Sequence, residues 1–307
     1  MKSNLQLKEN IVNLPSGDGG KILVTGANGQ LGSELRELSV QHTQYQFTFL
    51  SKEELDISDA EKTLSVFKNI SSDFCINCAA YTAVDKAETE KEKAYKINAG
   101  GAGNLANAAK KTRTRFIHIS TDYVFNGRSE KPYVEDHPTD PINVYGHSKL
   151  QGEIACQEEN DEAIIIRTSW VYSRFGNNFV KTMLRLMQTK KEINVVSDQY
   201  GSPTHATDLA QTIIQIINTK NWMPGIYHFS NEGETNWFEF AKAIKENINT
   251  DCLIHPISTE QYPTPAKRPN YSVFNKEKIK SVYGVVPNHW KDSLSICLEQ
   301  LKEKPQF

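Results

Sequence analysis

The feature that most constrains the fold is a glycine-rich turn that directly follows an apolar run. The run KILVT (residues 21–25) continues into GANGQLG (residues 26–32), after which apolar positions recur with helical spacing. In a strand–turn–helix unit the first glycine makes the tight turn, the second lets the backbone approach a pyrophosphate, and the third lets the helix pack on the sheet. The phosphates then meet the positive N-terminus of the helix. The sequence therefore predicts dinucleotide binding at Gly26, Gly29, Gln30, Leu31 and Gly32; the plainer alternative is a glycine-rich turn without a ligand.

Short apolar runs alternate with helical patterns along the first half of the chain. The expected strands are Lys21–Thr25, Gln46–Leu50, Phe74–Cys78, Arg115–Ser120 and Ala163–Thr168. The expected helices are Leu31–Ser39, Asp59–Lys68, Lys86–Lys111 and Val144–Glu158. This alternation is typical of a doubly wound parallel sheet with helices on both faces. The predicted fold class is therefore α/β, of the Rossmann type.

The pattern becomes mixed after Thr168. A helix at Phe179–Gln188, a strand at Ile193–Val196 and a helix at Asp208–Asn218 are followed by a loop-rich remainder. We expect residues 1–20, which are polar and lack periodicity, to be an N-terminal extension. Residues 21–168 are expected to form the dinucleotide-binding domain, with 193–218 returning to it. Residues 169–307 then form mainly a smaller, partly interleaved substrate lobe.

Composition excludes several classes of partner. Lys plus Arg is 35 and Asp plus Glu is 37 in 307 residues, a net charge of −2 that gives no electrostatic case for nucleic acid. No apolar run approaches the roughly 18 residues of a membrane span. Five cysteines, odd in number and loosely spaced, fit a reducing compartment, so we expect a cytoplasmic protein. Cys75 and Cys78 end a predicted buried strand, which favours a structural role, and no cluster has metal-ligand spacing.

A proton-transfer motif follows the fourth predicted strand. Tyr145 and Lys149, in NVYGHSKLQGE, lie one helical turn apart on the same face. A nearby ammonium lowers the pKa of a phenol, which makes it a usable general acid near neutral pH. Such a Tyr–Lys pair also arises by chance, so the pair alone is not evidence of catalysis. The evidence is its position after Ser120-Thr121-Asp122, which end a predicted strand at the edge where ligands bind. We expect Tyr145, Lys149 and Thr121 to be catalytic.

The end of the second predicted strand bears on the cofactor. A carboxylate at this position binds the adenosine ribose and favours NAD, but here Ser51 and Lys52 follow Leu50. A hydroxyl and a cation accommodate a 2′-phosphate, so we expect NADPH and leave NADH open. The alternative is that Lys52 is merely solvated.

Eight segments together resemble one known family. They are GANGQLG, LDISD, INCAAYTAVDKAE, INAGGAGNLA, HISTDYVFNG, NVYGHSKLQGE, IIRTSWVY and DQYGSPT, in unbroken order from about Lys21 to Phe274. The set is similar to the dTDP-4-dehydrorhamnose reductases, which are extended short-chain dehydrogenase/reductases. Residues 1–20 are not part of this pattern. Some members are described as Mg²⁺-dependent, but no group of residues in this sequence has the spacing of metal ligands, so we assign no metal site.

The resemblance implies an activity and roles for particular residues. It implies hydride transfer from NADPH or NADH to the C4 ketone of dTDP-4-dehydro-6-deoxy-L-hexose, giving dTDP-L-rhamnose for polysaccharide biosynthesis. Tyr145 would donate the proton, Lys149 would tune Tyr145 and hold the nicotinamide ribose, and Thr121 would hydrogen-bond the reacting oxygen. The implied cofactor contacts, besides the glycine loop, are Asp56, Ile57, Ala80, Tyr81, Thr82, Tyr145 and Lys149. The implied substrate contacts are Thr121, Asp122, Trp170 and Arg268.

Several of these side chains have plainer interpretations. Asp56 could cap a helix, and Trp170 could be a core indole. Arg268 could be a surface charge, although its planar fork matches a nucleotide diphosphate. Asn98 could be a buried packing amide, and we expect His118, in a predicted strand, to be a hydrogen-bonded core histidine.

Two other functions remain open at this point. One is a nucleotide-sugar epimerase or dehydratase of the same superfamily, but a dehydratase usually needs a carboxylate pair, and Tyr123 follows Asp122 here. The other is an NADP-binding regulatory subunit of methionine adenosyltransferase, a partner-binding module. A homodimer is also left open.

Overall fold

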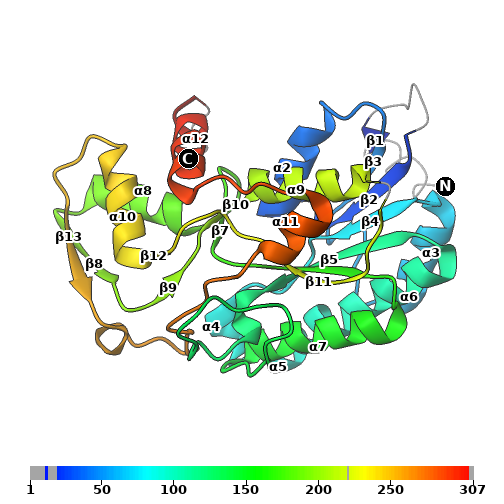
Figure 1. The fold of residues 1–307 in the computed structure, drawn as a ribbon, viewed down its shortest axis with the longest axis horizontal. Helices are drawn as coiled ribbons and strands as arrows, with labels where there is room; N and C mark the ends of the chain where they lie inside the picture. Colours follow the sequence, from blue (N-terminus) through cyan, green and yellow to red (C-terminus); the bar gives the residue numbers. More distant parts are fainter. Residues whose placement is uncertain (1–10, 13–18, 220, 304–307) are drawn as a thin grey trace.

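A seven-stranded sheet forms the centre of the part of the chain that the computed structural model describes, residues 11–12, 19–219 and 221–303 (Figure 1). The expected N-terminal extension, 1–20, lies largely outside these residues. The strand order is β1-β3-β2-β4-β5-β6-β11, and β1 is antiparallel to β3 while the other neighbouring pairs are parallel. The strands are β1 (Ile11–Val12), β2 (Lys21–Thr25), β3 (Gln46–Leu50), β4 (Phe74–Asn77), β5 (Arg115–Thr121), β6 (Ile164–Thr168) and β11 (Gly225–His228).

Helices cover both faces of this sheet (Figure 1). Helices α2 (Gln30–Ser39), α9 (Ala206–Asn218) and α11 (Glu277–Tyr283) share one apolar cluster with Ile22 and Val24 of β2. Helices α3 (Ala60–Ile70) and α6 (Ala102–Thr112) share another with Leu23, on the opposite face of the same strand, and Cys156 of α7 (Val144–Glu159) joins it. Alternate residues of one strand thus point into two cores, as expected for a parallel strand buried on both sides. The predicted α/β doubly wound fold is confirmed.

The predicted helix at Lys86–Lys111 is broken into several pieces. It comprises α4 (Val84–Ala87), α5 (Lys91–Tyr95), a π-helical turn η1 (Lys96–Gly101) and α6. The π-turn carries Asn98, whose buried amide pairs with the Tyr81 backbone: Nδ2 donates to the carbonyl at 3.0 Å and Oδ1 accepts from N–H at 2.7 Å. Such turns insert one extra residue into a helix and are frequent at functional sites.

The second half of the chain divides between two cores. Strand β8 (Glu192–Val196) pairs with β13 (Leu253–Ile257) in a separate two-stranded sheet. Helices α8 (Phe179–Thr189), α10 (Trp237–Glu246) and α12 (Trp290–Glu303) pack on it as a smaller lobe, at the left of Figure 1. Helix α9 instead packs on α2, and β11 extends the central sheet. Residues 193–218 are therefore split: β8 belongs to the smaller lobe and α9 to the larger.

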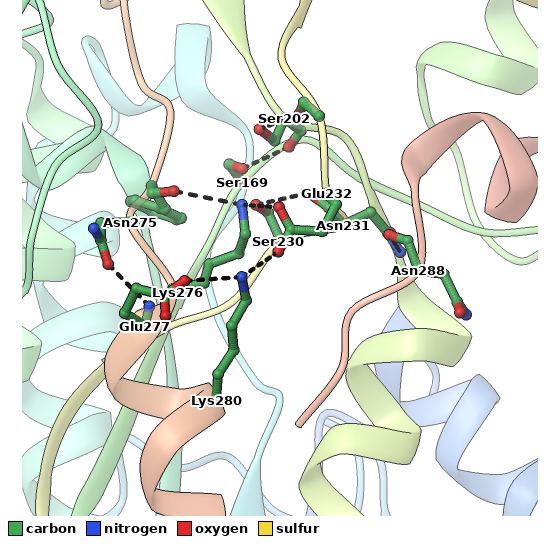
Figure 2. Close-up of polar contacts among 12 residues, drawn as sticks. Ser169, Ser202, Ser230, Asn231, Glu232, Asn275, Lys276, Glu277, Lys280 and Asn288 are labelled. Carbon is green, nitrogen blue, oxygen red and sulfur yellow. Dashed lines mark hydrogen bonds and ion pairs between the residues drawn. The ribbon is translucent and has the colours of Figure 1, made fainter. Parts of the chain in front are cut away.

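Short elements connect the two lobes. Two-stranded pairings join β7 (Val171–Tyr172) to β10 (Thr204–His205) and β9 (Tyr200–Gly201) to β12 (Thr235–Asn236), and 3-10 turns lie at η2 (Asp122–Val124) and η3 (Thr259–Gln261). Figure 2 shows the polar junction beside them, where Lys276 and Lys280 converge on Glu232 at 3.4 and 2.8 Å. Nearby, the Ser169 hydroxyl donates to the Ser202 carbonyl at 2.7 Å. These bonds fix the chain where it leaves β6 and β11, at the carboxyl edge of the sheet.

Candidate active site

The glycine loop has the geometry that a diphosphate needs. Gly26 has a φ of +68°, and a Cβ there would lie 2.5 Å from the backbone nitrogen of Ala79, so glycine is required. Gly29 has an ordinary φ of −76°, and a Cβ there would approach only the Gly26 carbonyl, at 3.3 Å. Helix α2 begins at Gln30 without a side-chain cap, which leaves its first N–H groups available for an anion. The residues present fit a dinucleotide.

These two glycines give a testable contrast. We expect Gly29→Ala to weaken NADPH binding about tenfold or more at a nearly unchanged melting temperature, because the new methyl group occupies the approach to the backbone. Gly26→Ala should lower the melting temperature itself, because the chain must move away from Ala79. Fluorescence titration and thermal melts measure the two effects. Unchanged NADPH affinity in the Gly29 variant would contradict this assignment of the loop.

The adenine end of the predicted cleft differs in detail from the sequence interpretation. The Asp56 carboxylate accepts from the backbone and hydroxyl of Ser58 at 3.0 and 2.7 Å, which lowers the pKa of Asp56. The interpretation of Asp56 as a helix cap is wrong, because Asp59 caps α3 by accepting from the Lys62 N–H. The neighbouring Ile57 is buried.

A carboxylate that the sequence analysis missed lies at the end of β3. The Glu54 side chain accepts from the Ser51 backbone N–H at 2.7 Å, whereas Lys52 is exposed. No signal in the sequence distinguished Glu54 from the neighbouring Glu53. The turn after β3 therefore carries a carboxylate as well as a cation.

Helix α7 brings Tyr145 to the end of β5. Asn143 caps the helix by accepting from the Gly146 N–H at 2.8 Å, and a Cβ at Gly146 would collide with the Tyr123 carbonyl. The helix start therefore presses against the turn that carries Thr121 and Asp122. The Thr121 hydroxyl donates to the Asp122 carboxylate at 3.0 Å, and it lies near enough to the Tyr145 phenol to act on the pKa of that group. Three predicted site residues are thus brought together.

The pKa values in this cluster follow from burial. Burial raises the pKa of Tyr145 to about 12, and the Thr121 hydrogen bond acts in the opposite direction. Lys149 is expected to lower this pKa together with the oxidised nicotinamide, and that expectation stays a prediction. The Lys149 Nζ donates to the Ile119 carbonyl at 2.6 Å and lies 3.2 Å from His118 Nε2. The phenol is therefore protonated near neutral pH, which is the form that a proton donor needs.

Asp122 is buried beside this phenol. It is 2% exposed, and burial raises its pKa to about 6, against the hydrogen bond from Thr121. A carboxyl group of this kind can change its protonation near neutral pH and can hydrogen-bond a sugar hydroxyl in either form.

The predicted cofactor-cleft segment, Ala80-Tyr81-Thr82, is fixed to the catalytic helix. Besides its two bonds to the Tyr81 backbone, Asn98 Nδ2 donates to the Ser148 hydroxyl at 2.9 Å. Asn98 is 1% exposed, so its packing role is confirmed, and it also links the cleft to α7.

Trp170 lies between the carboxyl edge and the smaller lobe. It has a left-handed backbone, with a φ of +48°, and its indole stacks on Trp237 with ring centroids 3.5 Å apart. Trp237 lines a pocket of about 300 Å³ in the smaller lobe, with α8, β8 and Arg268. The indole is half-buried, so it is neither a core residue nor a free surface group.

Arg268 forms a bidentate ion pair across the two lobes. Its Nη1 and Nη2 lie 3.1 and 2.9 Å from the two carboxylate oxygens of Asp85 in α4. The interpretation of Arg268 as an isolated surface charge is therefore wrong. Asp85 also accepts from the Ala266 N–H at 3.2 Å, and Asn143 Nδ2 donates to the Lys267 carbonyl at 2.7 Å. The 264–268 loop thus rests on α4 and on the residue that caps α7.

Two classes of feature are not observed. Within the described ranges, no three His, Cys, Asp or Glu side chains are grouped so that they could hold a metal ion. None of the described helices is both long and apolar enough to cross a membrane. The five cysteines are free thiols.

Comparison with known proteins identifies the family. The profile described as "RmlD substrate binding domain" matches residues 20–303. A dTDP-4-dehydrorhamnose reductase of Aggregatibacter actinomycetemcomitans is 40% identical over 284 residues, which cover 89% of this chain and 97% of the relative. The chain belongs to the dTDP-4-dehydrorhamnose reductase family. The resemblance seen in the sequence motifs is confirmed.

Other members of the family extend this likeness. The spore coat polysaccharide biosynthesis protein SpsK of Bacillus subtilis is 44% identical over 281 residues, covering 91% of this chain and 97% of SpsK. The crystal structure of a dTDP-4-dehydrorhamnose reductase from Bacillus anthracis in complex with NADP is 41% identical, with a TM-score of 0.88, covering 92% of this chain and 99% of that one. The Bordetella bronchiseptica enzyme WbmG, 18% identical with a TM-score of 0.80, shares the fold.

Proposed function

We propose that the protein reduces the C4 ketone of dTDP-4-dehydro-6-deoxy-L-hexose with NADPH and so forms dTDP-L-rhamnose. The observation that carries the proposal is the pairing of buried Thr121 with half-buried Tyr145 at the carboxyl edge of the sheet, where the phenol keeps its proton near neutral pH. Family membership supports the substrate, since the relatives are named for this reaction. The NADP in the Bacillus anthracis structure supports NADPH.

The chain's own side chains supply the proton chemistry in this proposal. When bound, the nicotinamide supplies a hydride to C4. Thr121 hydrogen-bonds the C4 oxygen, and Tyr145 gives its Oη proton to that oxygen as negative charge develops. Lys149 lies one helical turn from Tyr145, where its charge stabilises the phenolate left behind. Asp122, beside Thr121, holds a hydroxyl of the sugar.

The smaller lobe suits the nucleotide half of the substrate. Its pocket of about 300 Å³ combines apolar walls from Phe179, Met183 and Leu186 with Arg268. Apolar pockets with a few polar groups are typical of small-molecule sites, and an arginine fork matches a diphosphate. In the structure that fork is held by Asp85, so we propose that the diphosphate takes the place of the Asp85 carboxylate.

This exchange predicts opposite effects for two variants. Arg268→Ala should raise the KM for the dTDP-sugar about tenfold or more, because a charge-assisted contact is lost, and leave the Kd for NADPH unchanged. Asp85→Asn should lower the KM, because the amide releases the arginine while keeping the shape of the carboxylate. Steady-state kinetics with the sugar nucleotide varied gives both values. A change in NADPH affinity with Arg268→Ala would place this arginine on the cofactor side of the cleft.

A turnover assay tests the function as a whole. Purified protein with the 4-keto-6-deoxy sugar nucleotide should oxidise NADPH stoichiometrically, with NADH compared in parallel. An epimerase or dehydratase would convert its sugar nucleotide without consuming added cofactor. Tight NADPH binding without turnover of keto sugars would favour the regulatory-subunit alternative.

We place the reaction in polysaccharide biosynthesis and in the cytoplasm, where free thiols persist.

A further inference from the structure

Lys149 has a buried partner on β5 that the proposed mechanism does not use. His118 is 1% exposed, and its two ring nitrogens face different groups: Nδ1 lies 2.9 Å from Asn77 Nδ2, and Nε2 lies 3.2 Å from Lys149 Nζ. Burial and the nearby Lys149 hold the pKa of His118 well below its usual range, so the ring is neutral. A neutral imidazole carries one proton, and its position decides what Lys149 meets.

The orientation of Asn77 is fixed by a backbone donor. Its Oδ1 accepts from the Thr25 hydroxyl at 2.8 Å and from the Ala79 N–H at 3.0 Å. If the amide were turned over, its NH₂ group would face the Ala79 N–H, and two donors would oppose each other in a buried site. Asn77 Nδ2 therefore donates to His118 Nδ1.

It follows that the ring proton of His118 is on Nε2. An imidazole nitrogen that accepts a hydrogen bond carries no proton, so the neutral ring has its N–H at the other nitrogen. This N–H points at Lys149, which can accept it only as an amine, because an ammonium has three donors and no lone pair. Lys149 keeps one N–H for the Ile119 carbonyl, at 2.6 Å.

We propose that His118 is a positioning residue that presents its Nε2–H to Lys149 Nζ and so favours the amine over the ammonium form of this lysine. The inference rests on the proposed function for the role of Lys149: it identifies a group that limits the pH range over which the Lys149 charge can stabilise the Tyr145 phenolate.

Burial and other groups around Lys149 also act on its pKa. Burial lowers the pKa of Lys149 to about 8, while Glu153 and Cys156 on α7 act to raise it. Glu153 is in a buried ion pair with Arg167 of β6 at 2.7 Å, and burial raises the pKa of the Cys156 thiol to about 12. Tyr145, on the same helix, is protonated near neutral pH. Burial and the His118 N–H thus act in the same direction on Lys149, and His118 is the side chain on β5 that faces the Nζ.

NMR of the full-length protein labelled with ¹⁵N-histidine and ¹³C-lysine tests the proposal without using activity. The ¹⁵N shifts of His118, assigned by the loss of its signals in His118→Asn, should show protonation at Nε2. The ¹³Cε shift of Lys149, assigned with Lys149→Met, gives its pKa directly. In His118→Asn the new amide can still accept from Asn77 but presents no N–H to Lys149, so the pKa of Lys149 should rise by about one unit or more.

A second variant keeps the histidine and changes only its proton. Asn77→Asp offers a carboxylate oxygen to Nδ1, so the ring proton should move there and Nε2 should accept from a Lys149 ammonium. Thr25→Val is the matched control: it removes one donor to Asn77 but leaves the Ala79 N–H, so the His118 signals should stay as in wild type. Protonation at Nδ1 in the wild-type protein, or an unchanged Lys149 pKa in His118→Asn, would overturn the proposal. Because these signals need no substrate, a failed turnover assay leaves the outcome interpretable.

Discussion

Tyr145→Phe is expected to lower kcat for the keto sugar by about 10²–10⁴-fold, the usual contribution of a general acid. The variant keeps the ring, which meets the Tyr123 ring edge-on with centroids 5.4 Å apart, and removes only the hydroxyl that Thr121 binds. NADPH affinity should therefore change little. Steady-state kinetics gives kcat, and fluorescence titration gives the Kd for NADPH.

The neighbouring tyrosine provides the control for this variant. Tyr123→Phe removes a hydroxyl from the ring that packs on Tyr145, so it perturbs the same cluster without touching the proposed proton donor. Its kcat should remain close to wild type. If the two variants lost activity equally, the effect would lie in packing, and Tyr145 would no longer be the proton donor.

Five strands of the central sheet could be predicted from the sequence, whereas β1, β11 and the breaks in the long helix could not. Each predicted strand of the central sheet agrees with the structure to within about one residue, because apolar runs bounded by turn residues specify buried parallel strands locally. The interruption of the predicted Lys86–Lys111 helix depends on a side chain reaching another segment. Asn98 bonds the backbone of Tyr81, 17 residues away, and periodicity carries no sign of such a contact.

The members of the candidate site could be predicted better than their electrostatics. The order of Thr121 and Tyr145 along a βα unit is enough to expect them at one edge of the sheet, and the structure brings them together. The direction of the Tyr145 pKa could not be predicted, because it depends on how deeply the fold buries the phenol. The position of Lys149 Nζ could not be predicted either, because it is set by Ile119 and His118 on β5, 30 and 31 residues away. The Arg268–Asp85 pair, separated by 183 residues, has no sequence signal at all.

Lys149→Met should damage both chemistry and cofactor binding. We expect kcat to fall about 10²-fold or more, because the phenolate that forms on Tyr145 loses its stabilising charge, and NADPH to bind more weakly. The buried position, 2% exposed, accepts an unbranched apolar side chain of similar length. Kinetics and NADPH titration measure the two losses, and a melting curve shows whether the variant is folded.

The pH profile separates charge from packing. In the wild-type protein kcat should fall above about pH 8, where Lys149 loses the proton that stabilises the developing phenolate. The Tyr145 phenol does not cause this decline in kcat, because its pKa is raised to about 12. In Lys149→Met this decline should disappear, so that kcat is low and independent of pH up to about pH 10.

Lys149→Arg supplies the matched control, because a guanidinium keeps its charge over the whole range. Lys149→Arg should recover part of the kcat lost in Lys149→Met, and its kcat should show no decline near pH 8. If the decline persisted in both variants, it would belong to another group, and Lys149 would contribute binding rather than charge. If the decline disappeared in both variants and only arginine recovered activity, the charge at position 149 would have to act on the reacting proton.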